Sequence, residues 1–176
     1  PSPGERILEI GSGTGTGLAL MSEGLTNQGC AVGVDLSQKM LEHSQKKAQE
    51  LTTPTFHIQA DGAYLPLERA QFDGVLSSFT LELFSVQEIA LVLQEIKRVL
   101  QPSGRFAVVA LAQEPQNMAV QLYELAHWLF PVAIDCRPIP LIKLLKENGF
   151  EIKSTSKVFN WGLPVHITLC QPLHSS

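Results

Sequence analysis

Short apolar runs alternate along most of the chain with longer segments whose apolar residues recur every three or four positions. Runs of about four to eight residues favour buried strands, and the longer period favours helices that bury one face. This pattern predicts strands over residues 7–10, 30–34, 55–59, 72–78, 105–111, 150–158 and 165–171. It predicts helices from residue 18 onward, over 37–51, 85–100 and 116–130, and from Pro138 or Pro140 to Gly149.

Local signals between these segments support the assignment. Ser37 is placed to cap one helix, and Ser85 with Glu88 forms the capping box of another. The β-α-β alternation predicts one α/β domain over residues 1–176, with a Rossmann-like, doubly wound and mostly parallel sheet. No helix separates the last two strands, so we expect them to form an antiparallel hairpin at the edge of that sheet.

The densest glycine cluster of the chain directly follows the first predicted strand. Gly11, Gly13, Gly15 and Gly17 stand at alternate positions, and Glu9 lies two residues before the first of them. This spacing indicates a backbone that turns tightly or that a ligand approaches closely. A strand, such a loop and a helix together form a cradle of the kind that binds nucleotides. The alternative is a glycine-rich turn without a ligand.

The register of these glycines argues against a dinucleotide. The dinucleotide fingerprint requires glycines at relative positions one, three and six. None of the sixth positions counted from Gly11, Gly13 or Gly15 is a glycine. A nicotinamide or nucleotide-sugar oxidoreductase on a similar fold is therefore disfavoured.

A second acidic residue stands where a ribose would need it. Asp35 ends the predicted strand 30–34, and an acid about 20 residues after a glycine loop is placed to accept from ribose hydroxyls. One carboxylate can accept from two neighbouring hydroxyls at once. Taken alone, Asp35 could equally be a cap between strand and helix.

These stretches resemble the class I S-adenosylmethionine (SAM) methyltransferases. Residues 9–17 resemble the family's first motif, and residues 33–41 its second. Residues 60–67, 72–78 and 95–105 are similar to the methyltransferase type 11 branch, which includes the ubiquinone and menaquinone methyltransferases. The resemblance implies a seven-stranded sheet with an antiparallel last strand. It also implies SAM as cofactor, S-adenosylhomocysteine (SAH) as product and a small-molecule acceptor.

The resemblance further implies which residues bind the cofactor. The glycine loop would pass under the methionine part of SAM, Asp35 would hold the ribose, and Asp61 would recognise the adenine. The full set implied is Glu9, Gly11, Ser12, Gly13, Gly15, Asp35, Leu36, Met40, Asp61, Gly62, Ala63 and Ser78.

The chain also departs from the family pattern. Most members have Lys-Pro-Gly-Gly where this chain reads Gln-Pro-Ser-Gly at residues 101–104. Members usually have one or two helices before the first strand that help to close the site, and only Pro1 to Glu5 precede it here. We expect either that a lid has been trimmed or that the chain lacks one. A non-catalytic SAM-binding module, or a partner subunit of a methyltransferase, is the alternative function.

The amino-acid composition argues against some classes of partner. The net charge is −4 and no basic block occurs, which argues against nucleic acid. No apolar run approaches the ~20 residues of a membrane span. Three widely spaced cysteines without a CxxC pair indicate reduced thiols in a cytoplasmic protein and no metal site.

Residues 113–140 are predicted to lie on the acceptor side, either as a lid insertion or as a core helix, because periodicity alone does not separate the two. Their apolar side chains favour a lipid-like, quinone or aromatic acceptor. Lys and Arg are nearly absent from the predicted helix 116–130, so peripheral membrane contact is only weakly supported.

A general base is optional for methyl transfer, because the need for one depends on the pKa of the nucleophile. The candidates are His127, Asp135 and Glu82. Each also has a simpler interpretation: a packed or exposed helix histidine, a loop cap and a solvated acid, respectively. No triad or metal-ligand spacing supports any of them.

Overall fold

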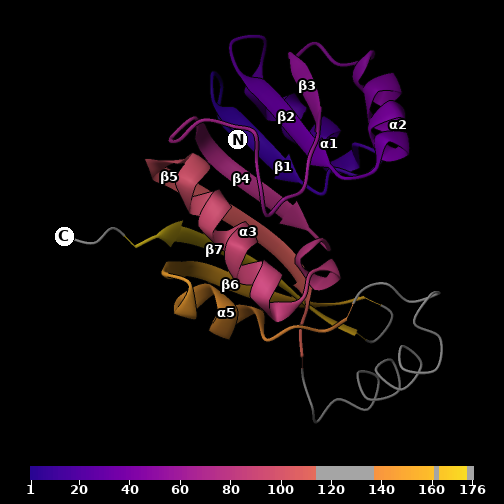
Figure 1. The fold of residues 1–176 in the computed structure, drawn as a ribbon. Helices are drawn as coiled ribbons and strands as arrows, with labels where there is room; N and C mark the ends of the chain where they lie inside the picture. Colours follow the sequence, from indigo (N-terminus) through magenta and orange to yellow (C-terminus); the bar gives the residue numbers. More distant parts are fainter. Residues whose placement is uncertain (114–136, 161–162, 174–176) are drawn as a thin grey trace.

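A computed structural model describes residues 1–113, 137–160 and 163–173, and Figure 1 shows the arrangement of their helices and strands. Seven strands form one sheet in the order β3-β2-β1-β4-β5-β7-β6. The strands are β1 (Arg6–Ile10), β2 (Cys30–Asp35), β3 (Thr55–Gln59), β4 (Phe72–Ser78), β5 (Leu100–Leu111), β6 (Phe150–Asn160) and β7 (Leu163–Pro172). The helices are α1 (Thr16–Leu25), α2 (Gln38–Ala48), α3 (Val86–Val99) and α5 (Leu141–Glu147), with a short 3-10 helix η1 (Leu81–Leu83).

The predicted fold class is confirmed. Strands β1 to β5 pair in parallel, whereas β7 is antiparallel to both β5 and β6. The last two strands form the expected hairpin, and β7 inserts between β5 and β6, so β6 is the edge strand. The predicted helix caps are also present, because Ser37 accepts from the Met40 N–H and Ser85 with Glu88 completes a capping box.

The predicted start of the fifth strand is wrong. Strand β5 begins at Leu100 rather than Arg105, because Leu100 already pairs with Phe72 of β4. The register then shifts before Gly74 pairs with Arg105. Residues 102–104 thus lie at an irregularity within a longer strand. The predicted helix 116–130 lies outside the described residues.

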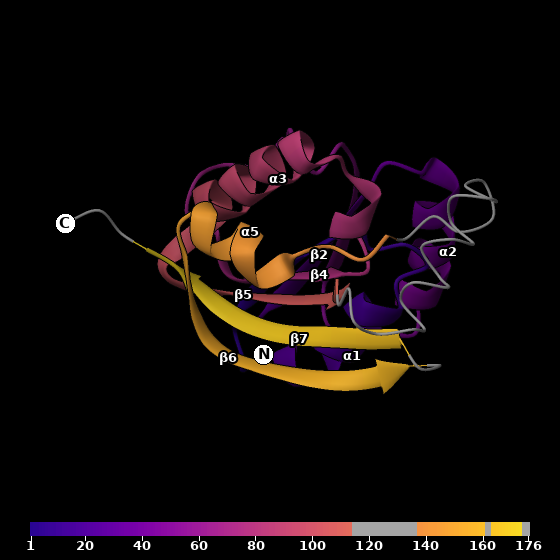
Figure 2. The ribbon, with the colours of Figure 1, turned by 90° about the horizontal axis from the view of Figure 1, so that it is seen from below.

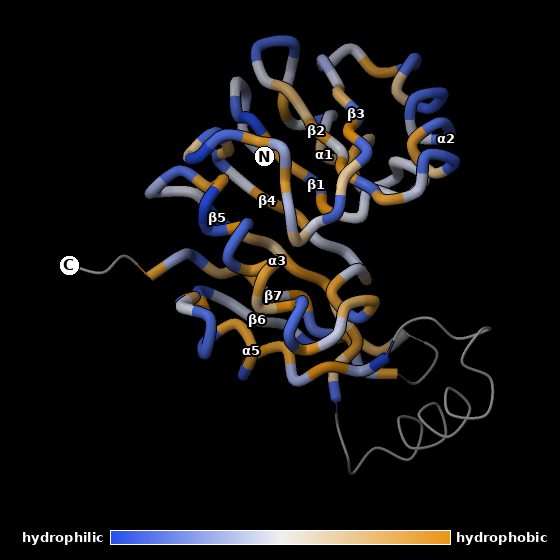
Figure 3. The backbone as a smooth tube through the Cα atoms, viewed as in Figure 1, coloured by the Kyte–Doolittle hydropathy of each residue, from blue (hydrophilic) through white to orange (hydrophobic). Residues whose placement is uncertain are grey.

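Helices cover both faces of the sheet, as the two views in Figures 1 and 2 show. Helices α3 and α5 pack on one face over the larger core, which includes Phe106 and Phe150 with ring centroids 5.6 Å apart. Helix α1 covers the other face through Leu18 and Leu25. Figure 3 shows the apolar residues along the strands and α3, and a largely hydrophilic α2. As the sequence predicted, the helices on the sheet bury one apolar face each.

An ion pair ties the start of the chain to the middle of the sheet. Arg105 of β5 donates from Nη1 and Nη2 to the two carboxylate oxygens of Glu5, at 2.8 and 2.6 Å. The hydrogen bond from Arg105 lowers the pKa of Glu5 to about 2. Glu5 directly precedes β1, so this pair lies near the amino end of that strand, whereas the glycine loop follows its carboxyl end.

Candidate cofactor-binding site

The glycine loop leaves the carboxyl end of β1, where ligands of doubly wound sheets bind. Gly13 has φ +50°, a left-handed conformation that side chains disfavour, and a Cβ built there would face open space. The Gly11 and Ser12 N–H groups donate to the Val34 carbonyl, and the Gly15 N–H donates to the Ser12 carbonyl. These donors are thus used within the protein. A phosphate-binding loop instead points its N–H groups at the anion.

Glu9 lies beneath the loop rather than in the pocket. Its side chain is buried, and a Cβ added to Gly17 would sit 2.0 Å from its Oε1. Burial raises the pKa of Glu9 to about 7, against a hydrogen bond from the Leu18 backbone that lowers it. Among the residues that the structure describes, its Oε2 has no hydrogen-bond partner. Glu9 therefore determines the identity of residue 17, since only glycine leaves room for its carboxyl group.

Asp35 joins the glycine loop to the start of α2. Its Oδ2 accepts from the Gly13 N–H and its Oδ1 from the Ser37 N–H, both at 2.8 Å. Each carboxylate oxygen has two lone pairs, so both can accept a further hydrogen bond. Asp35 also lines the pocket. It can therefore hold the loop and receive ligand hydroxyls at the same time.

Asp61 begins a turn beside Asp35, since the N–H of the preceding residue, Ala60, donates to the Asp35 carbonyl at 3.2 Å. Its Oδ1 accepts from the Ala63 N–H at 2.9 Å, and its backbone carbonyl accepts from the Tyr64 N–H at 2.9 Å. Asp61 and Gly62 line the pocket, whereas Ala63 is buried in the core. The turn leaves the carboxylate of Asp61 on the pocket wall, where it can accept from a ligand.

Asp35 and Asp61 both line a pocket of about 310 Å³, within the size range of small-molecule sites. Three of its residues are acids, Asp35, Asp61 and Glu88, and none of the described residues that line it is Lys or Arg. Its remaining lining is mostly apolar: Ile10, Gly11, Val34, Leu36, Ala60, Gly62, Thr80, Leu83 and Phe84. A site of this charge disfavours a pyrophosphate and suits a cation that carries hydroxyl and amino donors.

Ser12, Leu36, Met40 and Ser78 were also expected at the site. The Oγ of Ser12 is buried without a partner in the described structure. Leu36 is largely exposed on the pocket lining, and Met40 lies exposed on α2. The carbonyl of Ser78 accepts from the Thr80 hydroxyl at 3.0 Å. Of the twelve expected residues, the pocket lining therefore includes Gly11, Asp35, Leu36, Asp61 and Gly62.

Of the three candidate bases, the structure describes Glu82. Glu82 is buried in η1, and its Oε1 accepts from the Leu111 N–H at 2.8 Å. Burial raises the pKa of Glu82. The interpretation of Glu82 as a solvated acid is therefore wrong, because its carboxylate links η1 to the end of β5. His127 and Asp135 lie outside the described residues.

The expected set lacked seven residues of the lining, namely Ile10, Val34, Ala60, Thr80, Leu83, Phe84 and Glu88. The last four follow β4, whose carboxyl end neighbours that of β1. The capping box had marked Glu88 only as a helix start. The signal that could have revealed them is the sheet order, which places the loop after β4 beside the glycine loop.

No group of three potential metal ligands occurs within residues 1–113, 137–160 and 163–173. In the same ranges, no helix is both long and apolar enough to cross a membrane.

Comparisons with known proteins now identify the family. Residues 7–104, more than half of the chain, match the family model described as a methyltransferase domain. The chain is 33% identical to a demethylmenaquinone methyltransferase of Clavibacter sepedonicus, over 85% of this chain and 56% of that protein. It is 32% identical to an O-methyltransferase of Pyrenophora dematioidea, over 86% of this chain and 56% of that protein.

The chain belongs to the class I SAM-dependent methyltransferases. The fold agrees, because a SAM-dependent methyltransferase from Methanosarcina mazei superposes with a TM-score of 0.81 at 20% identity, covering 99% of this chain and 95% of that one. The chain spans about half the length of these curated relatives. The cofactor of the family is SAM. The pocket described above fits it, because a lining with three acids and no Lys or Arg among its described residues suits a sulfonium cation with a ribose and an adenine.

Proposed function

We propose that this chain binds SAM in the pocket between the glycine loop and the loop after β3, and that it transfers the methyl group to a small, largely apolar acceptor. The observation that carries the proposal is that Asp35 and Asp61 line one pocket, without Lys or Arg among its described residues. In this proposal the Asp35 carboxylate accepts from the ribose hydroxyls of SAM, and the Asp61 carboxylate accepts from its adenine amino group.

The residues of the chain bind and orient, and the bound SAM supplies an electrophilic methyl group. Gly13 leaves space for the methionine part beside the loop. Asp35 orients the ribose, and the apolar side chains of Ile10, Leu83 and Phe84 exclude water from the reacting centre. Holding two reactants in line and away from water accounts for much of the rate of such a displacement.

The acceptor class rests on two supports. The relatives are named for demethylmenaquinone and for O-methylation, and the pocket side near η1 is lined by Leu83 and Phe84. Apolar surface beside a cofactor pocket favours an aromatic, quinone or lipid-like acceptor. Residues 113–140 are proposed to cover this acceptor. All but Gln113 and residues 137–140 of that segment lie outside the described structure.

The first expected result is that titration calorimetry detects binding of SAM and SAH but not of NAD. Three carboxylates at the pocket repel a pyrophosphate, and the loop N–H groups are already bonded within the protein and cannot bind one. The same carboxylates attract a sulfonium cation. Transfer is then followed with methyl-labelled SAM and a panel of hydroquinones, catechols and sugars. Label should pass to the apolar aromatic acceptors and not to the sugars.

Two outcomes would contradict this. Heat of binding with NAD and none with SAM would overturn the cofactor assignment. Binding of SAM without transfer to any acceptor, in the presence of the flanking residues of the native gene product, would favour a non-catalytic SAM-binding module or partner subunit.

A second expected result concerns Asp61. The parent protein should bind SAH about tenfold more tightly than an SAH analogue that has hydrogen in place of the exocyclic amine, because one hydrogen bond to a carboxylate is lost. Asp61→Ala should bind the two ligands with nearly equal affinity. The same penalty in both proteins, measured by calorimetry, would show that Asp61 only shapes its turn.

A further inference from the structure

Two residues of α3 hold the loop that carries Asp61. Residues 60–71 connect β3 to β4 without a helix or strand of their own, yet Ala60, Asp61 and Gly62 form one wall of the pocket. A loop of this length has many accessible conformations, and ordering its backbone costs conformational entropy. Specific contacts must therefore select the conformation seen.

Glu95 and Arg98 supply those contacts through one connected network. Arg98 donates from Nη1 to the Leu67 carbonyl at 2.7 Å and from Nη2 to the Leu65 carbonyl at 3.0 Å. Glu95 Oε2 accepts from the Leu65 N–H at 2.8 Å. The two side chains also bond each other twice, at 2.7 Å each. Both backbone groups of Leu65 are thus bonded to this pair, which we call the α3 clamp.

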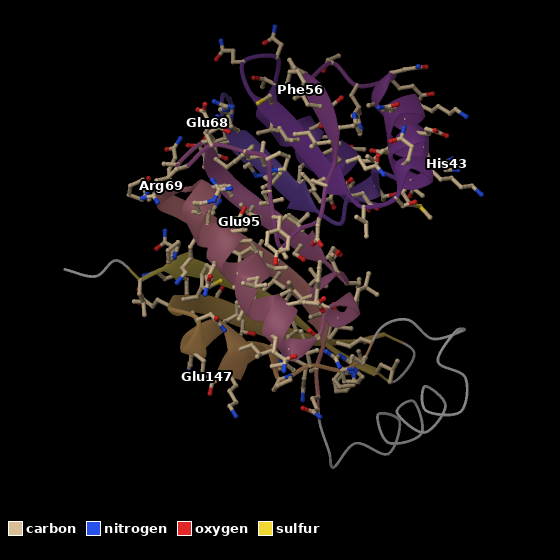
Figure 4. All side chains as sticks on the ribbon, viewed as in Figure 1. His43, Phe56, Glu68, Arg69, Glu95 and Glu147 are labelled. Carbon is tan, nitrogen blue, oxygen red and sulfur yellow. The ribbon has the colours of Figure 1, made fainter. Side chains whose placement is uncertain are left out.

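Leu65, which the α3 clamp holds, is close in sequence to residues 60–62 of the pocket wall. Leu65 directly follows the turn in which the Asp61 carboxylate and carbonyl accept from Ala63 and Tyr64. The side chains of Ala63 and Leu65 are both buried in the core. Figure 4 labels Glu95 on α3, with Glu68 and Arg69 on the adjoining loop. Fixing Leu65 therefore fixes the end of the turn whose first residue is Asp61.

Helix α3 also reaches the pocket directly. Glu88 lies two helical turns before Glu95 and lines the pocket. Between them, Val92 is the nearest α3 residue to Gly62, since a Cβ built on Gly62 would lie 3.9 Å from its methyl group. One face of α3 thus follows the loop from the pocket to the clamp.

We propose that Glu95 and Arg98 are positioning residues that set the adenine selectivity of the pocket. By bonding both backbone groups of Leu65, they hold Asp61 where its carboxylate accepts from the exocyclic amine. The inference rests on the proposed function, because it takes SAH and SAM as the ligands of this pocket.

The test compares Arg98→Met with Arg105→Met. Methionine replaces the aliphatic part of the arginine side chain but removes every hydrogen bond of the guanidinium. Arg105 forms an equally bidentate pair with Glu5 at the far end of the sheet, so its variant controls for general destabilisation. Glu95→Gln is a milder second variant that keeps an acceptor for Leu65 and weakens the bond to Arg98. Calorimetry measures the affinities of each protein for SAH and for the analogue without the exocyclic amine.

The ratio of these two affinities is the decisive quantity, because a purely structural role would not change it. We expect about tenfold in the parent and in Arg105→Met. The ratio should fall to about twofold in Arg98→Met and to an intermediate value in Glu95→Gln. Hydrogen exchange of the Leu65 amide should rise in Arg98→Met and stay at the parent rate in Arg105→Met.

The outcomes separate the two proposals. A parent ratio retained in Arg98→Met, or an unchanged Leu65 exchange rate, would overturn the positioning role while leaving SAM binding intact. A parent that binds SAH without discrimination would overturn it as well, through Asp61. A parent that binds neither ligand would overturn the proposed function, and the Leu65 exchange rate would then still decide whether the clamp orders the loop.

Discussion

Glu9→Gln should reduce the loss of stability that the parent shows as the pH rises from about 4.5 to 7. Burial raises the pKa of Glu9 from 4.5 to about 7 in the folded protein. In that window the folded state keeps a proton that the unfolded state releases, so the free energy of unfolding falls with increasing pH. Each pKa unit corresponds to about 1.4 kcal/mol, so the ionised carboxylate costs roughly 3 kcal/mol above pH 7.

Urea unfolding at a series of pH values measures this. Glutamine has the same shape and still accepts from the Leu18 N–H, so the variant should be more stable than the parent at pH 8 and similar at pH 5. Glu23→Gln, an exposed position on α1, is the matched control and should leave the slope unchanged. Glu82, whose pKa is also raised by burial, should leave a residual slope in the Glu9 variant. A parent-like slope in Glu9→Gln would show that the Glu9 carboxyl is not the group responsible.

Asp35→Ala should weaken SAM and SAH binding by about 1.5–3 kcal/mol, because it removes a charged acceptor of two hydroxyls. The structure places the loss toward the upper end of this range. The same carboxylate accepts from the Gly13 and Ser37 N–H groups, so its removal also loosens the loop. Calorimetry with SAH, together with the melting temperature of the ligand-free protein, separates the two contributions.

Asp35→Asn should lie between the parent and the alanine variant. Its amide oxygen can replace one carboxylate oxygen, but its NH₂ group would face a backbone donor at Gly13 or Ser37. Glu42→Ala removes the same charge from an exposed position on α2 and should bind SAH as the parent does. If Asp35→Ala binds SAH as tightly as Glu42→Ala, the ribose assignment is wrong.

The sequence alone determined the features that depend on local order. The strand and helix periods, the Ser37 cap, the Ser85 and Glu88 capping box and the alternation of elements are readable because each depends on residues within about two turns or one strand. The failed dinucleotide register of the glycines also required only counting. Together these predicted the fold class and the terminal hairpin, and the resemblance of residues 9–17 and 33–41 to known motifs indicated the family.

Only the tertiary structure decided what depends on distant neighbours. Glu9 and Asp35 look alike in sequence as acids at the ends of strands, yet one is buried under the loop and the other lines the pocket. The sheet order brings the loop after β4 beside the glycine loop, and so adds Thr80, Leu83 and Phe84 to the site. The bonds from Arg98 to Leu65 and Leu67 likewise span about thirty residues of sequence. Burial and long-range pairing follow from how the helices pack on the two faces of the sheet, and no local pattern encodes them.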